Sequence, residues 1–168
     1  MNIGILGSGL MGGKLGTIFA RAGHDVVFSY SHSERKLKRL AREAKAHTRA
    51  GTPREANLGA DALLLAVHWS RVDDVLKQAG DLSGKVIISC SLPMNANDTA
   101  LAVAHTSSGA EALARKVRKA KVVSAFQHRS ERGAVRRLRR QATDPPPAEP
   151  HALRRRPGRE RDRGDFDS

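Results

Sequence analysis

The chain has 168 residues, a formal net charge of +13 and a single cysteine. This length suffices for one domain with an aliphatic core, and one cysteine excludes an intrachain disulfide. No apolar run approaches the roughly 20 residues that span a bilayer, and the N-terminus lacks the basic and apolar segments of a signal peptide. We therefore expect a cytoplasmic protein with no membrane span.

Strand and helix patterns alternate from the N-terminus onward. Residues 2–6 are apolar and lead into glycines, as a buried strand would. Apolar residues at helical spacing follow over 9–22, where Gly23 ends the helix. A second apolar stretch covers 26–29, and Ser33 can cap another helix. The first part of the chain therefore predicts two strand–helix units.

The same alternation continues to residue 126. Further strands are predicted over 48–50, 62–67, 86–90 and 121–125. Capping signals and helical periodicity predict the helices between them, which begin after Thr52, near Val72, and after Ser107 or Ser108. Strands that alternate with helices in this way require a parallel sheet with helices on both faces.

The turn after the first predicted strand has the pattern G-x-G-x-x-G. Its first glycine permits a tight turn, the second lets the backbone approach a pyrophosphate, and the third lets the helix lie close to the sheet. The candidate cofactor-binding residues here are Gly7, Ser8, Gly9, Leu10, Met11 and Gly12. A plain glycine-rich turn is the alternative. In the context of the strands and helices, the motif predicts an α/β fold, a Rossmann-type doubly wound parallel sheet in the order 3-2-1-4-5-6.

The end of the second predicted strand indicates which dinucleotide binds. A site that prefers NAD usually has Asp or Glu there to bind the ribose 2′-hydroxyl. This chain has Ser31 instead, with Arg35 and Lys36 in the helix that follows. Hydroxyls and cations suit a 2′-phosphate, so the sequence favours NADP(H). The alternative is that Arg35 and Lys36 belong to a solvated helix face.

Five stretches of the chain together form a recognisable family pattern. They are Asn2-Ile3-Gly4-Ile5-Leu6-Gly7-Ser8-Gly9, Ala22-Gly23-His24-Asp25-Val26-Val27, Ala66-Val67-His68-Trp69, Leu82-Ser83-Gly84-Lys85-Val86-Ile87 and Val122-Val123-Ser124-Ala125-Phe126. The glycine turn is common to many dehydrogenases, whereas the block around Trp69 and the last predicted strand are more specific. On these stretches the chain resembles the coenzyme F420-dependent NADP oxidoreductases, also called NADPH-dependent F420 reductases, over residues 1 to about 127.

The resemblance implies hydride transfer between NADP(H) and a 5-deazaflavin, coenzyme F420. Such a reaction depends mainly on the positioning of two flat rings, and we identify no catalytic acid–base set and no metal site. By resemblance, Val67, His68 and Trp69 form a wall at the nicotinamide end, with Ser91 nearby. Two alternatives stay open: His68 is a surface histidine, and Trp69 is a core aromatic residue.

The family pattern stops near residue 127, and 1–127 is the predicted NAD(P)-binding domain. Every lysine of the chain lies before this point, whereas every basic residue of 128–168 is an arginine, and the tail is also rich in proline. Such a composition buries little apolar area and predicts disorder. The tail is interpreted as the product of a truncation or a reading-frame shift. The alternative, a nucleic-acid-binding arm, is not favoured because Phe166 is its only aromatic residue.

Two further hypotheses about function stay open. The chain is a catalytically inactive dinucleotide-binding module if the family's C-terminal region is missing. It is an NADPH-dependent reductase of another acceptor if it acts like the related Rossmann enzymes that reduce imines or metal ions. We expect small-molecule cofactors as its partners, and self-association is left open.

Overall fold

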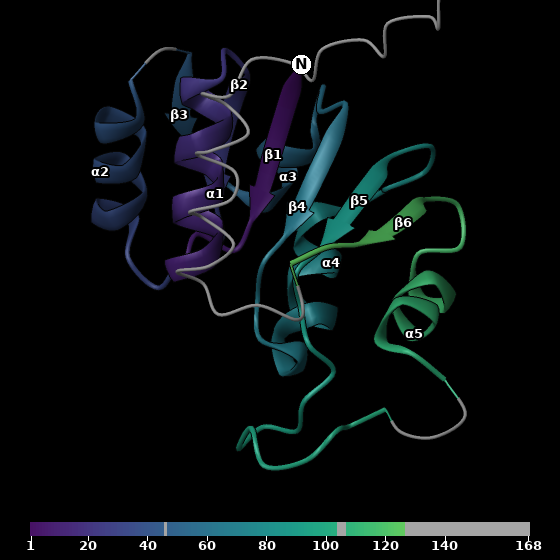
Figure 1. Cartoon of the computed structure of the whole chain (residues 1–168). Coiled ribbons are helices and arrows are strands. Elements are labelled where there is room, and N and C mark those ends of the chain that lie inside the picture. The colour runs from purple at the N-terminus through teal and green to yellow at the C-terminus, as the bar shows by residue number, and fades with distance from the viewer. Residues whose placement is uncertain (46, 104–106, 127–168) are drawn as a thin grey trace, which may run out of the picture.

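The computed structural model describes residues 1–45, 47–103 and 107–126 (Figure 1). The tail over 128–168, for which the sequence predicts disorder, lies outside the described residues. One parallel sheet organises the described part of the chain. Its strands are β1 (Asn2–Leu6), β2 (Asp25–Ser29), β3 (Thr48–Ala50), β4 (Ala62–Leu65), β5 (Val86–Ser89) and β6 (Lys121–Ser124).

The strands are arranged in the order β3-β2-β1-β4-β5-β6, and every neighbouring pair is parallel. This confirms the doubly wound, Rossmann-type order predicted from the sequence. The chain reverses its direction of travel between β3 and β4, so β1 and β4 lie side by side at the centre of the sheet. Ligands of such sheets bind outside the carboxyl ends of the strands at this switch point.

The helices begin where capping residues stand in the sequence. Ser33, Thr52 and Ser108 each accept a hydrogen bond from a backbone N–H of the helix that follows. Thr52 forms the predicted capping box with Glu55, which fixes the short helix after β3. The helices are α1 (Leu10–Arg21), α2 (Glu34–Ala44), α3 (Pro53–Asn57), α4 (Val72–Ala79) and α5 (Gly109–Lys116).

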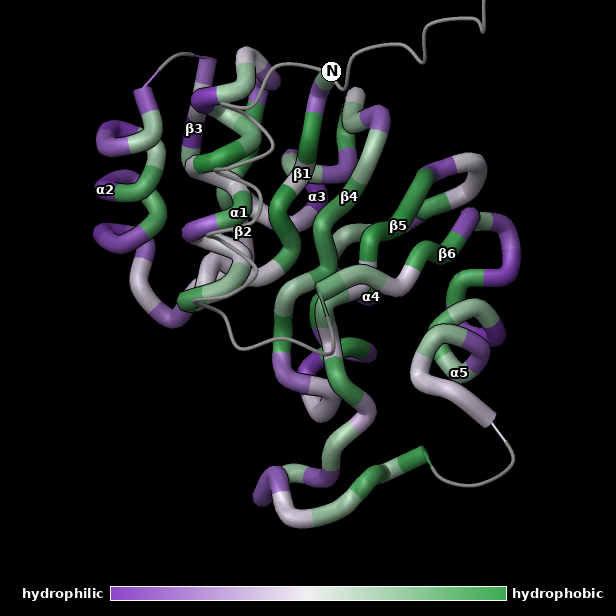
Figure 2. Tube along the Cα trace, in the orientation of Figure 1, coloured by the Kyte–Doolittle hydropathy of each residue, from purple (hydrophilic) through white to green (hydrophobic). Residues whose placement is uncertain are grey.

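Helices cover the sheet from two sides, and each side has its own apolar core. Leu15 of α1 and Leu37 of α2 pack on Ile5, Phe28 and Leu64 of the sheet. On the opposite face, buried residues of α3, α4 and α5 pack on the strand residues that alternate with these. Figure 2 shows hydrophobic residues along β1, β4 and β5 and hydrophilic residues along α2. Two helical layers therefore enclose one nearly continuous hydrophobic sheet, as parallel sheets require.

The main departure from prediction lies after β4. The predicted strand over 62–67 ends at Leu65, although the N–H of Ala66 still bonds to the carbonyl oxygen of Leu6 at 2.9 Å. The chain then turns into a 3₁₀-helix, η1 (Trp69–Arg71), that the sequence patterns do not predict. Among the described residues, no helix is long and apolar enough to cross a membrane.

Candidate functional site

The glycine turn connects β1 to α1 as its three glycines require. Gly7 has a φ of +110°, a conformation that other residues rarely adopt. A Cβ on Gly12 would overlap the carbonyl oxygen of Gly7, so the helix lies directly against the turn. A Cβ on Gly9 would meet no atom of the residues that the structure describes within 4 Å. Gly7 and Gly12 are thus required by the fold itself, whereas Gly9 faces open space in which a ligand can approach the backbone.

Ser8 ties the turn to the second strand. It is fully buried, and its hydroxyl donates to the carbonyl oxygen of Ser29 at 2.8 Å. The N–H groups of Gly7 and Ser8 donate to the same oxygen at 3.2 and 3.1 Å. Because these groups are engaged within the protein, Ser8 holds the shape of the turn, and its hydroxyl faces inward.

The N-terminus of α1 is open. No side chain among the described residues caps it, and its first turn contains no acidic residue. Leu10 is 58% exposed there, while Met11 packs partly against the core. The unpaired N–H groups and the positive end of a helix dipole favour an anion at such a position. This end of α1 therefore fits a phosphate group.

The end of β2 carries the residues predicted to select NADP(H). Ser31 lies beside the cap of α2, where its hydroxyl accepts from the N–H of Ser33 at 3.3 Å. Arg35 is exposed and Lys36 is half-buried. Within the described residues neither forms an ion pair, whereas Lys38 and Arg39 are paired with glutamates one turn along the helix. Arg35 and Lys36 are thus the two cations of this turn whose charge is available to a ligand.

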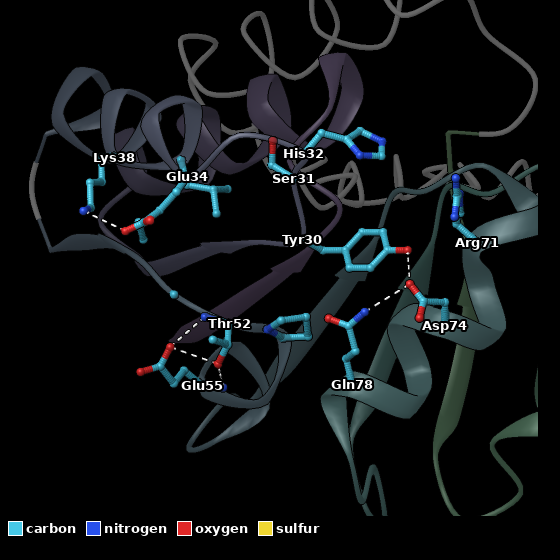
Figure 3. A pocket seen from close by; sticks show the side chains of 14 residues that line it. Tyr30, Ser31, His32, Glu34, Lys38, Thr52, Glu55, Arg71, Asp74 and Gln78 are labelled. Atoms are coloured by element: carbon cyan, nitrogen blue, oxygen red, sulfur yellow. Dashed lines mark hydrogen bonds and ion pairs between the residues drawn. The ribbon is translucent and has the colours of Figure 1, made fainter.

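A cleft of about 700 Å³ opens next to Ser31, at the carboxyl ends of β2 and β3 (Figure 3). Arg35 and Lys36 are not among the residues that line it, and Arg35 borders a neighbouring shallow cavity along α2. The polar side chains of the cleft come from the ends of β2 and β3 and from α2, α3, η1 and α4. They are Tyr30, Ser31, His32, Glu34, Lys38, Thr52, Glu55, Arg71, Asp74 and Gln78.

The residues after β4 stand close to the glycine turn. A Cβ on Gly7 would lie 2.6 Å from Cγ1 of Val67, so Val67 borders the turn. The carbonyl oxygen of Val67 accepts a 2.7 Å hydrogen bond from the hydroxyl of Ser91, which is nearly fully buried. The structure thus brings together Gly7, Val67 and Ser91, which come from three different βα connections. Trp69 begins η1 and packs partly against the core.

His68 has defined partners on both ring nitrogens. The N–H of Ser70 donates to Nδ1 at 3.2 Å, so Nδ1 is the acceptor and the proton of the neutral ring is on Nε2. Nε2 lies 2.8 Å from Oδ1 of Asp98, to which it donates. His68 is therefore oriented by a carboxylate from the loop after β5, an arrangement that fixes the ring.

Sequence patterns did not identify Asp98, Tyr30 or Asp74 as site residues. Each lies in the chain far from its partner, since Asp98 contacts His68 and Asp74 contacts Tyr30. The one local signal was the position of Tyr30 directly after β2, where dinucleotide-binding sheets place residues that contact the cofactor.

The fold and the glycine turn define the class of the protein: it is a Rossmann-type α/β protein whose first strand–helix turn carries the dinucleotide-binding fingerprint. The sequence profile of the coenzyme F420-dependent NADP oxidoreductases matches residues 2–93, which is more than half of the chain. The chain belongs to this family. No curated protein matches it.

Solved structures share the fold at low sequence identity. A putative F420-dependent NADP reductase from Arthrobacter sp. FB24 has a TM-score of 0.70 and 22% identity, over 79% of this chain and 64% of that chain. A hypothetical protein from Sinorhizobium meliloti has a TM-score of 0.69 and 23% identity, over 80% and 65%. A reductive aminase from Aspergillus terreus, in complex with NADPH and ethyl levulinate, has a TM-score of 0.53 and 22% identity, over 73% and 39%. The chain thus spans just under two thirds of the first two proteins.

Proposed function

We propose that the chain binds NADP(H) and transfers hydride between NADP(H) and the 5-deazaflavin coenzyme F420. The observation that carries the proposal is the glycine turn: no side chain of the described residues caps α1, and these residues leave the space beside Gly9 open to a pyrophosphate. Membership of the F420-dependent NADP oxidoreductase family supports the choice of reaction. The Arthrobacter protein of similar fold is itself described as a putative F420-dependent NADP reductase.

The chain's own residues would bind and orient the cofactor. The N–H groups at the start of α1, over Leu10, Met11 and Gly12, would hold the pyrophosphate, while Ser31, Arg35 and Lys36 would bind the 2′-phosphate. Val67, His68, Trp69 and Ser91 would line the nicotinamide end. The nicotinamide supplies or accepts the hydride, so the protein contributes position and exclusion of water. No catalytic residue is assigned.

Two measurements on the full chain test the proposal. NADPH is titrated by nicotinamide fluorescence, and turnover is followed by the loss of absorbance of oxidised F420 on addition of NADPH. We expect saturable binding of NADPH and F420 reduction that depends on it. If NADPH does not bind, the cofactor assignment is wrong.

A second candidate is an inactive dinucleotide-binding module. It is favoured by the described residues themselves, which supply a cofactor-binding turn and among which no catalytic residue is assigned. NADPH binding without F420 turnover would support it. A third candidate is an NADPH-dependent reductase of another acceptor, favoured by the similarity in fold to the reductive aminase. NADPH oxidation with imines or ketones in the absence of F420 would support that function.

A further inference from the structure

Tyr30 links the end of β2 to α4 across the cleft. Its hydroxyl donates to Oδ2 of Asp74 at 2.5 Å, and the side-chain amide of Gln78 donates to the same oxygen at 3.0 Å (Figure 3). Tyr30 and Asp74 are 44 residues apart in the chain. The hydroxyl end of Tyr30 is therefore held by the carboxylate of Asp74, which is itself held by a second donor, Gln78.

The backbone of Tyr30 is also held. Its φ is 54°, in the left-handed region that bulky residues seldom adopt unless neighbouring contacts maintain it. Its carbonyl oxygen accepts from the N–H of Ser8 at 3.2 Å, within the glycine turn. Tyr30 is thus fixed at both ends, by the glycine turn through its backbone and by α4 through its hydroxyl.

The ring of Tyr30 lines the cleft of about 700 Å³, which His32 and Arg71 also line (Figure 3). Burial and the bond to Asp74 raise the pKa of Tyr30 to about 12, so the phenol stays protonated and remains a donor at neutral pH. The hydrogen bonds from Tyr30 and Gln78 lower the pKa of Asp74, so its carboxyl stays ionised. Aromatic and cationic groups around an open space suit a flat heteroaromatic ring.

We propose that Asp74 is a positioning residue, which holds the Tyr30 ring as the platform on which the adenine base of the dinucleotide stacks. The inference rests on the proposed function, because it assigns one end of the cofactor to this cleft. Asp74 acts through Tyr30 and does not itself contact the base. A purely structural link between β2 and α4 would instead affect folding and every ligand alike.

The test uses the full chain and three probes: NADPH, 2′,5′-ADP for the adenosine half, and reduced nicotinamide mononucleotide for the other half. Tyr30→Phe keeps the ring and removes the bond, and Asp74→Ala removes the acceptor. We expect each variant to bind NADPH and 2′,5′-ADP up to about ten-fold more weakly, because a ring released from Asp74 must be ordered again when the base stacks on it. The double variant is expected to be no weaker than either single variant, and binding of the mononucleotide is expected to stay unchanged.

Two further variants separate positioning from stability. Asp74→Asn keeps an acceptor oxygen and is expected to restore most of the affinity. Asp73→Ala is the matched control, because Asp73 lies on the same helix and pairs with Lys116 away from the cleft. The melting temperature of every variant is measured alongside.

Failure of the inference and failure of the proposed function give different results. Binding of 2′,5′-ADP that is unchanged in Tyr30→Phe and Asp74→Ala, in a chain that binds NADPH, would overturn the inference alone. Equal losses for 2′,5′-ADP and the mononucleotide would also overturn it, because they would indicate a general structural role. If the unaltered chain binds neither NADPH nor 2′,5′-ADP, the proposed function falls and the inference with it.

Discussion

Gly12 lies against Gly7 so closely that a side chain on Gly12 would overlap the carbonyl oxygen of Gly7. This contact lets the first turn of α1 start directly above the end of β1. The third glycine of the motif is therefore a requirement of packing, whereas the second glycine, Gly9, has no neighbour within 4 Å of its would-be Cβ. The motif thus contains glycines with two different roles, packing at Gly12 and access for a ligand at Gly9. Substitutions at the two positions can distinguish these roles.

Gly12→Ala should destabilise the fold. The added methyl group meets backbone that cannot move aside, and overpacking of this kind typically costs about 1–3 kcal/mol of the free energy of unfolding. Urea denaturation followed by circular dichroism measures the loss. A variant as stable as the unaltered chain would show that α1 can shift away from the turn.

Gly9→Val should abolish NADPH binding and change stability less than binding. A Cβ at this position would meet no atom of the described residues within 4 Å, so the added side chain has room to enter. The valine would occupy the space of the pyrophosphate. NADPH titration together with thermal unfolding checks both parts, and unchanged affinity would contradict the assignment of the turn.

Local chemistry explains why so much of the fold could be predicted from the sequence. Strand β1 and the start of α1 were predicted because an apolar run meets the glycine motif within a few residues. The capping box of Thr52 and Glu55 lies within one helical turn, so its residues identify it without any distant partner. The strand order followed from the motif's association with the Rossmann fold.

The contacts of the candidate site depend on long-range packing and were not predictable. Tyr30 meets Asp74 and His68 meets Asp98, over 44 and 30 residues of chain. No periodicity or spacing relates such residues, because their proximity exists only once the sheet has formed. The predicted length of β4 was too great for a similar reason. The apolar residues Ala66 and Val67 continue the strand pattern, but they lie beside the glycine turn that follows β1.

NADPH should bind at least about ten-fold more tightly than NADH. Charge-assisted hydrogen bonds of about 1.5–3 kcal/mol would come from Ser31 and Arg35 to the 2′-phosphate, which NADH lacks. Arg35→Ala should remove most of this difference, and isothermal titration with both cofactors measures it.

Arg42→Ala is the matched control for Arg35→Ala. Both arginines border the same shallow cavity of α2, and Arg42 lies two turns, about 10 Å, further along the helix. It should leave the ratio of the two affinities unchanged. Equal affinities of the unaltered chain for NADPH and NADH would refute the assignment of NADP(H).

Cys90 should react slowly with thiol reagents in the folded chain. Burial raises the pKa of its thiol to about 12, and the thiolate is the reactive form. Alkylation by iodoacetamide at pH 8, followed by mass spectrometry, should become fast only in denaturant. Rapid alkylation of the native chain would show that the region after β5 opens readily.

The same residue predicts a dependence of stability on pH. The unfolded thiol has a pKa near 9.0 and the folded thiol one near 12, so above pH 9 the unfolded state loses the proton first. The contribution of Cys90 to stability is therefore complete below pH 9 and is lost as the pH rises toward 12. Cys90→Ala should show a smaller fall in melting temperature between pH 8.5 and 10 than the unaltered chain.

Strand β6 should promote self-association. Among the described residues it pairs only with β5, and Val123 is 50% exposed on the face of the sheet that α1 and α2 cover elsewhere. An edge strand with an exposed apolar side chain is a template for pairing with another chain.

Val123→Lys should therefore lower the associated fraction, measured by size-exclusion chromatography with light scattering over a range of concentrations. Ser124→Lys adds the same charge to the strand but keeps Val123, so its effect should be smaller. An unaltered chain that stays monomeric over the whole range would show that this edge does not drive association.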